Sequence, residues 1–206
     1  QYAIASAASP RLEAISHNIT RNRFTMSTTQ ADSTAFEVPV IDISPYTGNG
    51  TAEDRARVAD EMDRACSTVG FVQVLGHAVP DDVWRGLGEA VDDFFGQSLE
   101  EKKTYVAQGN RGYSPPKSES LSLSLGIEAA SRMNDFFEAF NVGTEARSFA
   151  GLDLSEDDYG INVWPDLDGF RPKVEEYYAH AARVARVLTS VFADALSLPS
   201  DFFEYM

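Results

Sequence analysis

The segment from Asp168 to Leu196 constrains the fold more than any other, because it has the periodicity of a long amphipathic helix. Its apolar residues recur at steps of three, four or seven and so line one helical face: Phe170, Val174, Tyr177, Ala181, Val184, Leu188, Val191 and Ala195. Four more widen that face: Tyr178, Ala185, Phe192 and Leu196. A helix of about 28 residues is about 42 Å long, more than a small domain's core requires. We expect a spine helix on which something large packs.

Composition limits the class of protein. The chain has 206 residues, of which 43% are hydrophobic, enough to bury a core. Its formal net charge of -15 disfavours nucleic acids and anionic membranes as partners, because both attract basic proteins. No apolar run approaches the roughly 18 residues of a membrane-spanning helix. The single cysteine, Cys66, excludes an internal disulfide and favours a reducing, cytoplasmic location.

The first 36 residues are expected to form a disordered leader. Residues 1–25 contain three Arg and one Glu in a Ser- and Ala-rich context, a composition typical of a transit peptide. Alternatively, Met26 is the natural start and the leader is translated upstream sequence, which is the preferred explanation. Residues 27–35 are polar and lack the apolar content of a folded segment.

The chain between the leader and the spine helix mixes helices and strands. Strands are predicted at 38–43, 71–75 and 134–142 from short apolar and β-branched runs. Two capping boxes, Thr51 with Asp54 and Ser98 with Glu101, open helices. The first helix is expected to bury Val58, Met62, Ala65, Cys66 and Val69, and the helix after Pro80 to bury Trp84, Leu87, Val91, Phe94 and Phe95. The order lacks a regular βαβ rhythm, which favours an α+β fold.

The loop Gly109–Pro116 interrupts this regularity. Its two glycines and two prolines indicate an irregular backbone around three side chains with polar reach, Arg111, Tyr113 and Ser114. Loops of this kind often carry function. A surface turn whose tyrosine simply packs explains the pattern equally well.

No catalytic constellation is complete in the sequence. One cysteine and three widely separated histidines do not make a zinc site. The acidic segment 153–160 lacks the glycine of a calcium loop. His77 at a strand-to-helix turn is expected to make a structural hydrogen bond, and His180 to lie off the apolar stripe.

Five short motifs occur in order along the chain. They are Val38-Pro39-Val40-Ile41-Asp42; Ala65-Cys66 with Gly70-Phe71-Val72-Gln73-Val74 and Gly76-His77; Phe94-Phe95 with Ser98-Leu99-Glu100-Glu101-Lys102; Gly112-Tyr113; and Asn162-Val163-Trp164-Pro165. The ordered set resembles the N-terminal region of the isopenicillin N synthase-like oxygenases, which are non-haem iron enzymes that mostly use 2-oxoglutarate. Many members have Asn-His-Gly where this chain has Gly76-His77. The matching position of Cys66 implies a packing role on a helix core.

The resemblance implies a jelly-roll enzyme whose iron(II) is held by two histidines and one carboxylate. In that family two ligands come as His-x-Asp, with a distant second His followed by Arg-x-Ser for 2-oxoglutarate. Here His17 precedes Asn-Ile, His77 precedes Ala-Val and His180 precedes Ala-Ala, so none fits. We therefore expect a fragment that lacks most of the jelly roll and contributes no catalytic residue and no metal ligand.

The resemblance also implies an organisation and a function. A non-haem dioxygenase N-terminal domain is expected at 37–160, and residues 161–206 are expected to hold the spine helix that leads into the absent jelly roll. The full-length enzyme would use iron(II), O2 and 2-oxoglutarate to oxidise a small organic molecule, and this chain alone would bind neither cofactor and be inactive. Arg111, Tyr113 and Ser114 would face the substrate, with Arg111 pairing a carboxylate. The alternative is a non-catalytic interaction module.

Overall fold

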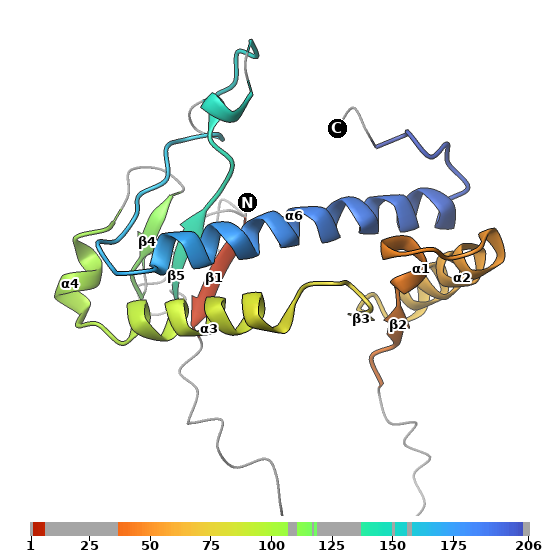
Figure 1. Cartoon of the computed structure of the whole chain (residues 1–206), viewed down its shortest axis with the longest axis horizontal. Helices are drawn as coiled ribbons and strands as arrows, with labels where there is room; N and C mark the ends of the chain where they lie inside the picture. The colour runs from red at the N-terminus through yellow and green to blue at the C-terminus, as the bar shows by residue number, and fades with distance from the viewer. Residues whose placement is uncertain are drawn as a thin grey trace, which may run out of the picture. The chain divides into compact units, whose positions relative to one another are not determined.

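The structure is a computed structural model that describes residues 2–6, 37–106, 111–116, 118, 137–149, 151–155 and 158–203. Its elements in chain order (Figure 1) are β1 Tyr2–Ser6, β2 Val40–Asp42, α1 Ser44–Thr47, α2 Ala52–Thr68, β3 Gln73–Leu75, α3 Asp81–Phe95, α4 Leu99–Lys103, β4 Gly112–Ser114, β5 Glu138–Val142, the 3-10 turn η1 Ala146–Ser148 and α6 Phe170–Ala195. Helices and strands are mixed, as the sequence predicted.

The chain divides into two compact units. Unit 1 comprises residues 1–20 and 85–174, and unit 2 comprises residues 21–84 and 175–206. The boundaries between the units fall within α3 and α6.

The helix predictions that rest on local sequence are confirmed. The spine helix is α6, with 26 residues. The Thr51 hydroxyl accepts from the Asp54 amide, and the Asp54 carboxylate accepts in return from the Thr51 amide, so α2 begins with a complete capping box. Ser98 and Glu101 form the same reciprocal pair at the start of α4. The Ser98 hydroxyl also donates to the Glu101 carboxylate at 2.7 Å, and this bond together with that from the Ser98 amide holds the pKa of the Glu101 carboxyl below its ordinary value.

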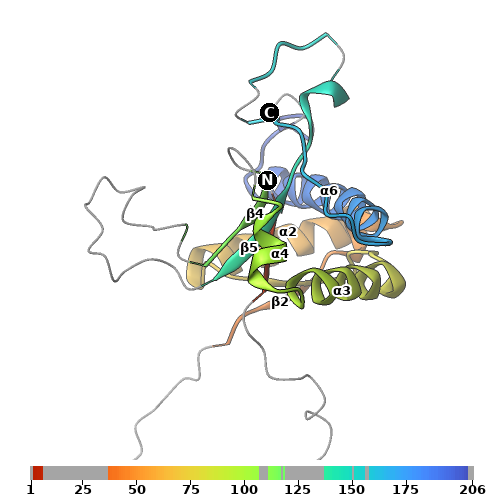
Figure 2. The same cartoon turned by 90° about the vertical axis from the view of Figure 1, so that its left-hand side faces the viewer.

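Unit 1 contains an antiparallel sheet with the strand order β1-β5-β4. Strand β5 is central, pairing with β1 on one edge and with β4 on the other. The helix α4 lies beside the β4–β5 pair in both views (Figures 1 and 2). Four of the five residues of β5, from Ala139 to Val142, are buried, which fits its central position in the sheet.

The core of unit 1 is built around the ring of Phe94 on α3, which is fully buried. Its ring centroid lies 4.7 Å from that of Phe140 on β5, 5.7 Å from that of Tyr113 on β4 and 5.6 Å from that of Phe170 on α6. The two strand contacts are edge-to-face, the arrangement that aromatic pairs favour. One side chain thus joins two helices to two strands.

Unit 2 contains a parallel pair of strands, β2 and β3, in which Ile41 lies opposite Val74. A buried cluster packs these strands against α2 and the second half of α6: Ile41, Ile43, Val58, Met62, Ala65 and Val191. Gly70 follows α2 with a positive φ of 80°, which any other residue would adopt at a cost. The apolar stripe predicted on α6 therefore does contribute a buried residue, Val191, to this cluster.

Four predictions of burial are wrong. Trp84 is 63% exposed on α3, although Leu87 and Phe94 are buried there as predicted. Cys66 is exposed on α2 and does not pack in the core. Phe192 and Leu196, both assigned to the apolar face of the spine helix, are exposed, whereas Val191 and Ala193 are buried. Each of these residues lies at the edge of an apolar face, where the tertiary partner decides which side is covered.

Part of the predicted leader is a strand. Residues 2–6 form β1, where disorder was expected, while residues 1 and 7–36 lie outside the described part of the chain. The alternating leucines at 121, 123 and 125 also lie outside it. Within the described residues, no helix has the length and apolar character needed to cross a membrane.

Replacing Phe94 with alanine should reduce the free energy of unfolding by about 3–5 kcal/mol, because a fully buried ring is lost and a cavity remains. Urea unfolding of the 206-residue chain, followed by circular dichroism, measures the change. The matched control is Phe71→Ala, since Phe71 is 70% exposed and should cost less than about 1 kcal/mol. Equal effects of the two variants would contradict the central role of Phe94.

Candidate functional site

The three residues selected from the sequence meet at the β4–β5 pair of unit 1. Tyr113 lies opposite Phe140 and Ser114 lies opposite Ala139 in the antiparallel register. Side chains of consecutive strand residues point to opposite faces, so Tyr113 and Ser114 serve different faces of the sheet. Arg111 and Tyr113 are buried, whereas Ser114 is half-buried.

Arg111 is held against the backbone of the segment that follows β5. Its Nη2 donates to the carbonyl of Asp158 at 2.7 Å and lies 3.4 Å from that of Thr144. A Cβ at Gly143 would come within 2.6 Å of the same Nη2, so the guanidinium occupies space that only a glycine leaves open. Arg111 therefore fixes this segment to the start of β4.

Tyr113 belongs to a buried polar network with Glu138 and Lys102. Its hydroxyl donates to Glu138 Oε2 at 2.5 Å, and Lys102 Nζ lies 2.8 Å from the same oxygen. Lys102 also donates to the carbonyl of Phe95 at 3.2 Å. The exposed fraction of the side chain is 7% for Lys102 and 20% for Glu138, so this ion pair is largely removed from water.

The network keeps the phenol of Tyr113 neutral. Burial raises its pKa above the ordinary value, and the hydrogen bond to Glu138 and the charge of that carboxylate raise it further. A neutral phenol that already donates to a carboxylate cannot serve as a base at neutral pH. The arrangement is therefore suited to holding β4, β5 and α4 together.

On the other face of the sheet, Ser114 contacts Asn141. The Asn141 Nδ2 donates to Ser114 Oγ at 3.1 Å, and Asn141 itself is buried. Among the described residues, none accepts a hydrogen bond from the Ser114 hydroxyl. Of the three predicted residues, Ser114 thus has a polar group with hydrogen-bonding capacity to spare on a partly exposed surface.

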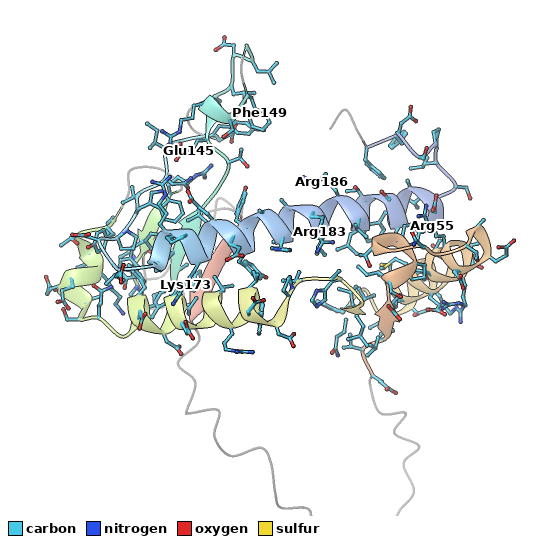
Figure 3. The ribbon with its side chains drawn as sticks, in the orientation of Figure 1. Arg55, Glu145, Phe149, Lys173, Arg183 and Arg186 are labelled. Carbon is cyan, nitrogen blue, oxygen red and sulfur yellow. The ribbon has the colours of Figure 1, made fainter. Side chains whose placement is uncertain are left out.

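Asn162, from the fifth sequence motif, anchors the segment after β5. Its Oδ1 accepts a hydrogen bond from the Gly143 amide at 2.9 Å, and its Nδ2 donates to the Gly143 carbonyl at 2.8 Å. The backbone amide of Asn162 donates to the Glu145 carboxylate at 3.0 Å. Figure 3 labels Glu145 on this segment. Burial raises the pKa of the Glu145 carboxyl, but the Asn162 hydrogen bonds and the charge of Arg147 outweigh it, so the pKa lies below its ordinary value.

Sequence reasoning missed Lys102, Glu138 and Asn141 as members of this site. One signal was present for Glu138, because it is the only charged residue in the apolar run from Phe136 to Val142. A charge within such a strand needs a buried partner. The partner, Lys102, lies 36 positions earlier, and nothing in the local sequence identifies it.

The described residues do not fit an iron centre. No three or more His, Cys, Asp and Glu side chains among them form a group that could hold a metal ion. His77 makes the structural hydrogen bond expected of it, since its Nδ1 accepts from the Val79 amide at 3.1 Å. No chemical step is therefore assigned to a metal in this part of the chain.

Replacing Lys102 with methionine should lower the free energy of unfolding by about 3–5 kcal/mol, because it leaves the Glu138 carboxylate without its charge partner. The adjacent Lys103 is a matched control. Its pair with Glu100 is exposed, and Lys103→Met should cost less than about 1 kcal/mol. Urea unfolding compares the two, and a Lys102→Met loss no larger than the Lys103→Met loss would show that the network does not stabilise unit 1.

Comparisons with solved structures support the same architecture. A full-length protein of Neurospora crassa, solved in complex with alpha-KG, is similar with a TM-score of 0.64 at 20% identity, covering 84% of this chain and 51% of that one. A putative 2OG-Fe(II) oxygenase family protein from Caulobacter crescentus also has a TM-score of 0.64, at 24% identity, covering 81% of this chain and 51% of that one. At these identities the likeness concerns the fold.

Three curated proteins are similar to this chain in sequence. The chain is 30% identical to 2-oxoglutarate-dependent dioxygenase thnC of Trichoderma harzianum, over 81% of this chain and 50% of that protein. It is 34% identical to azadirone synthase LFS of Melia azedarach, over 69% of this chain and 42% of that protein. It is 31% identical to isopenicillin N synthase of Streptomyces griseus, over 81% of this chain and 50% of that protein. The chain spans about half the length of the curated relatives it matches.

The family comparison covers most of the described core. The profile described as non-haem dioxygenase in morphine synthesis, N-terminal, matches residues 38–167. This range contains β2 to β5. It also contains the network of Tyr113, Glu138 and Lys102 and the hydrogen-bonded pair of Ser114 and Asn141. Because the match covers more than half of the chain, the protein belongs to the non-haem dioxygenase N-terminal family, which confirms the resemblance drawn from its sequence motifs.

Proposed function

We propose that this chain is the N-terminal part of a non-haem iron(II)- and 2-oxoglutarate-dependent oxygenase that oxidises a small organic molecule with O2. The observation that carries the proposal is the family match over residues 38–167. The curated relatives add support, because several are named as 2-oxoglutarate-dependent dioxygenases. A cytoplasmic location belongs to the same proposal and rests on composition alone.

The proposal assigns the metal site to a jelly-roll region beyond this chain. The described residues offer no group of metal ligands, and the matched relatives are about twice as long as the region they share with it. In this proposal residues 37–160 form the N-terminal domain, and the jelly roll covers the apolar residues that remain exposed near the C-terminal end of α6. Phe192 is exposed on that helix and would be covered there.

The proposal also separates the roles of the three residues selected from the sequence. Ser114 would contact the substrate, with Asn141 orienting its hydroxyl. Arg111 and Tyr113 would act as positioning residues, because their polar groups already bond to Asp158 and Glu138. This division differs from the direct carboxylate recognition expected of Arg111.

The activity test compares this chain with a longer protein expressed from the continued coding sequence. With iron(II), ascorbate and 2-oxoglutarate, the longer protein should release CO2 from 2-oxoglutarate, and the 206-residue chain should not, since its described residues offer no metal-ligand group. The continued sequence should contain His-x-Asp, a distant His and Arg-x-Ser. A continuation without these motifs, or turnover by this chain alone, would contradict the proposal. The former result would favour the non-catalytic interaction module.

Ser114→Ala in the longer protein should raise KM for the organic substrate about fivefold with kcat nearly unchanged, as expected when one hydrogen bond of about 1 kcal/mol to bound substrate is lost. Steady-state kinetics under saturating 2-oxoglutarate measures both constants. Ser118→Ala is the control, because Ser118 is an exposed serine four residues away. If the two variants have the same KM, Ser114 does not contact the substrate.

A further inference from the structure

One edge of β5 in unit 1 is closed by a strand from the start of the chain. Strand β1, drawn in red beside β5 in Figure 1, pairs with it antiparallel over all five residues, from Tyr2 opposite Val142 to Ser6 opposite Glu138. On its other edge β5 pairs with β4 over residues 139–141 alone. The longer ladder of this central strand is therefore the one that it makes with β1.

Strand β1 lies outside the part of the chain that matches the family. The match covers residues 38–167, which include β4 and β5, whereas β1 ends at Ser6. The family domain thus provides an acceptor edge, and a segment from outside the domain fills it. Without β1, this edge of β5 would present a row of unpaired N–H and C=O groups, which is a template for another strand.

The covalent connection between β1 and β5 is long and indirect. Residues 1–20 and 85–174 make up unit 1, while residues 21–84 belong to unit 2. Between the two strands the chain therefore passes through unit 2. The effective concentration of a tethered segment falls as its tether lengthens, so a strand supplied by another molecule can compete with β1 for the same edge.

The pairing is of a kind that other peptides can make. Ladder hydrogen bonds join backbone groups, so they require an extended segment and no particular side chain. The sequence of β1 alternates larger and smaller residues, with Ile4 opposite Phe140 and Ala3 opposite Asn141. Both partners on β5 are buried. The acceptor strand therefore selects the spacing of large and small residues, and the backbone supplies the affinity.

We propose that this edge of β5 is a site for strand addition and that β1 is its exchangeable occupant. The ligand is an extended, mostly apolar peptide that alternates larger and smaller residues, as residues 2–6 do, and it adds antiparallel to residues 138–142. The site lies on the edge of β5 opposite to the one that pairs with β4. It does not depend on the oxygenase function proposed above.

The test uses the 206-residue chain with Ala3 and Ile4 both replaced by proline. Successive residues of a strand direct their N–H groups to opposite edges, so the Ala3→Pro/Ile4→Pro variant loses a hydrogen bond to β5 and should release β1. Hydrogen–deuterium exchange with mass spectrometry follows residues 138–142. Their amides should exchange at least tenfold faster in the variant than in wild type. A synthetic peptide with the sequence of residues 1–8 should restore their protection.

Binding of the same peptide, labelled with fluorescein, is measured by fluorescence anisotropy. The variant should bind it saturably, and wild type should bind it at least tenfold more weakly, because an edge that β1 fills nine-tenths of the time reduces the apparent affinity about tenfold. The matched control peptide carries proline at its third and fourth positions and should not bind.

Four results overturn the proposal. They are equal affinity of wild type and variant for the peptide, binding that does not saturate, equal binding of the two peptides, and unchanged exchange of residues 138–142 in the variant. A variant that also loses protection in α2 and α3 contradicts the proposal as well, because β1 would then be an integral part of the fold and not an exchangeable strand.

Discussion

The edge-to-face packing of Phe94 is the interaction on which unit 1 depends. From α3 its ring reaches Tyr113 of β4, Phe140 of β5 and Phe170 at the start of α6. These contacts keep water away from the far side of Tyr113, whose hydroxyl meets the Glu138 carboxylate. In a dry environment a hydrogen bond and an ion pair are electrostatically stronger, and an unpaired charge is more costly. The aromatic core and the polar network thus stabilise each other.

At the β4–β5 site, the polar groups of Tyr113 and Arg111 hold the strands and the following segment in place. The Tyr113 phenol is neutral and already donates to Glu138, and the Arg111 guanidinium is tied to backbone carbonyls. Two glycines make this arrangement possible: Gly112 adopts a φ of 81°, and Gly143 leaves room for the Arg111 guanidinium. Such a framework can hold the Ser114 hydroxyl at a fixed place on the opposite face, as the proposed substrate contact requires.

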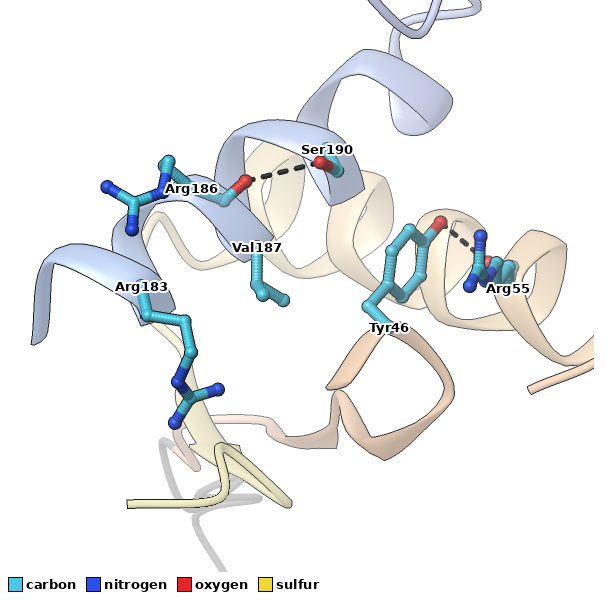
Figure 4. Close-up of a pocket in the computed structure, with 6 residues that line it drawn as sticks. All are labelled: Tyr46, Arg55, Arg183, Arg186, Val187 and Ser190. Carbon is cyan, nitrogen blue, oxygen red and sulfur yellow. Dashed lines mark hydrogen bonds between the residues drawn. The ribbon is translucent and has the colours of Figure 1, made fainter. Parts of the chain in front are cut away.

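Unit 2 shows why net charge does not describe a surface. The chain is strongly acidic, but Arg55, Arg183 and Arg186 line one pocket (Figure 4), and two of them are oriented by hydrogen bonds to backbone carbonyls. Those carbonyls belong to the segments that directly follow β2 and β3, so the fold of the parallel pair determines where the guanidinium groups lie.

The sequence by itself determined the features that depend on neighbouring residues. The length of α6, both capping boxes and the hydrogen bond of His77 follow from local spacing, because each involves groups within a few positions of one another. Tertiary structure alone decided which edge of a helix is covered, so Trp84 and Cys66 are exposed against expectation. It also decided the partners of Arg111 and Lys102, which lie 47 and 36 positions away. Such pairings are set by how strands and helices pack, which no local pattern specifies.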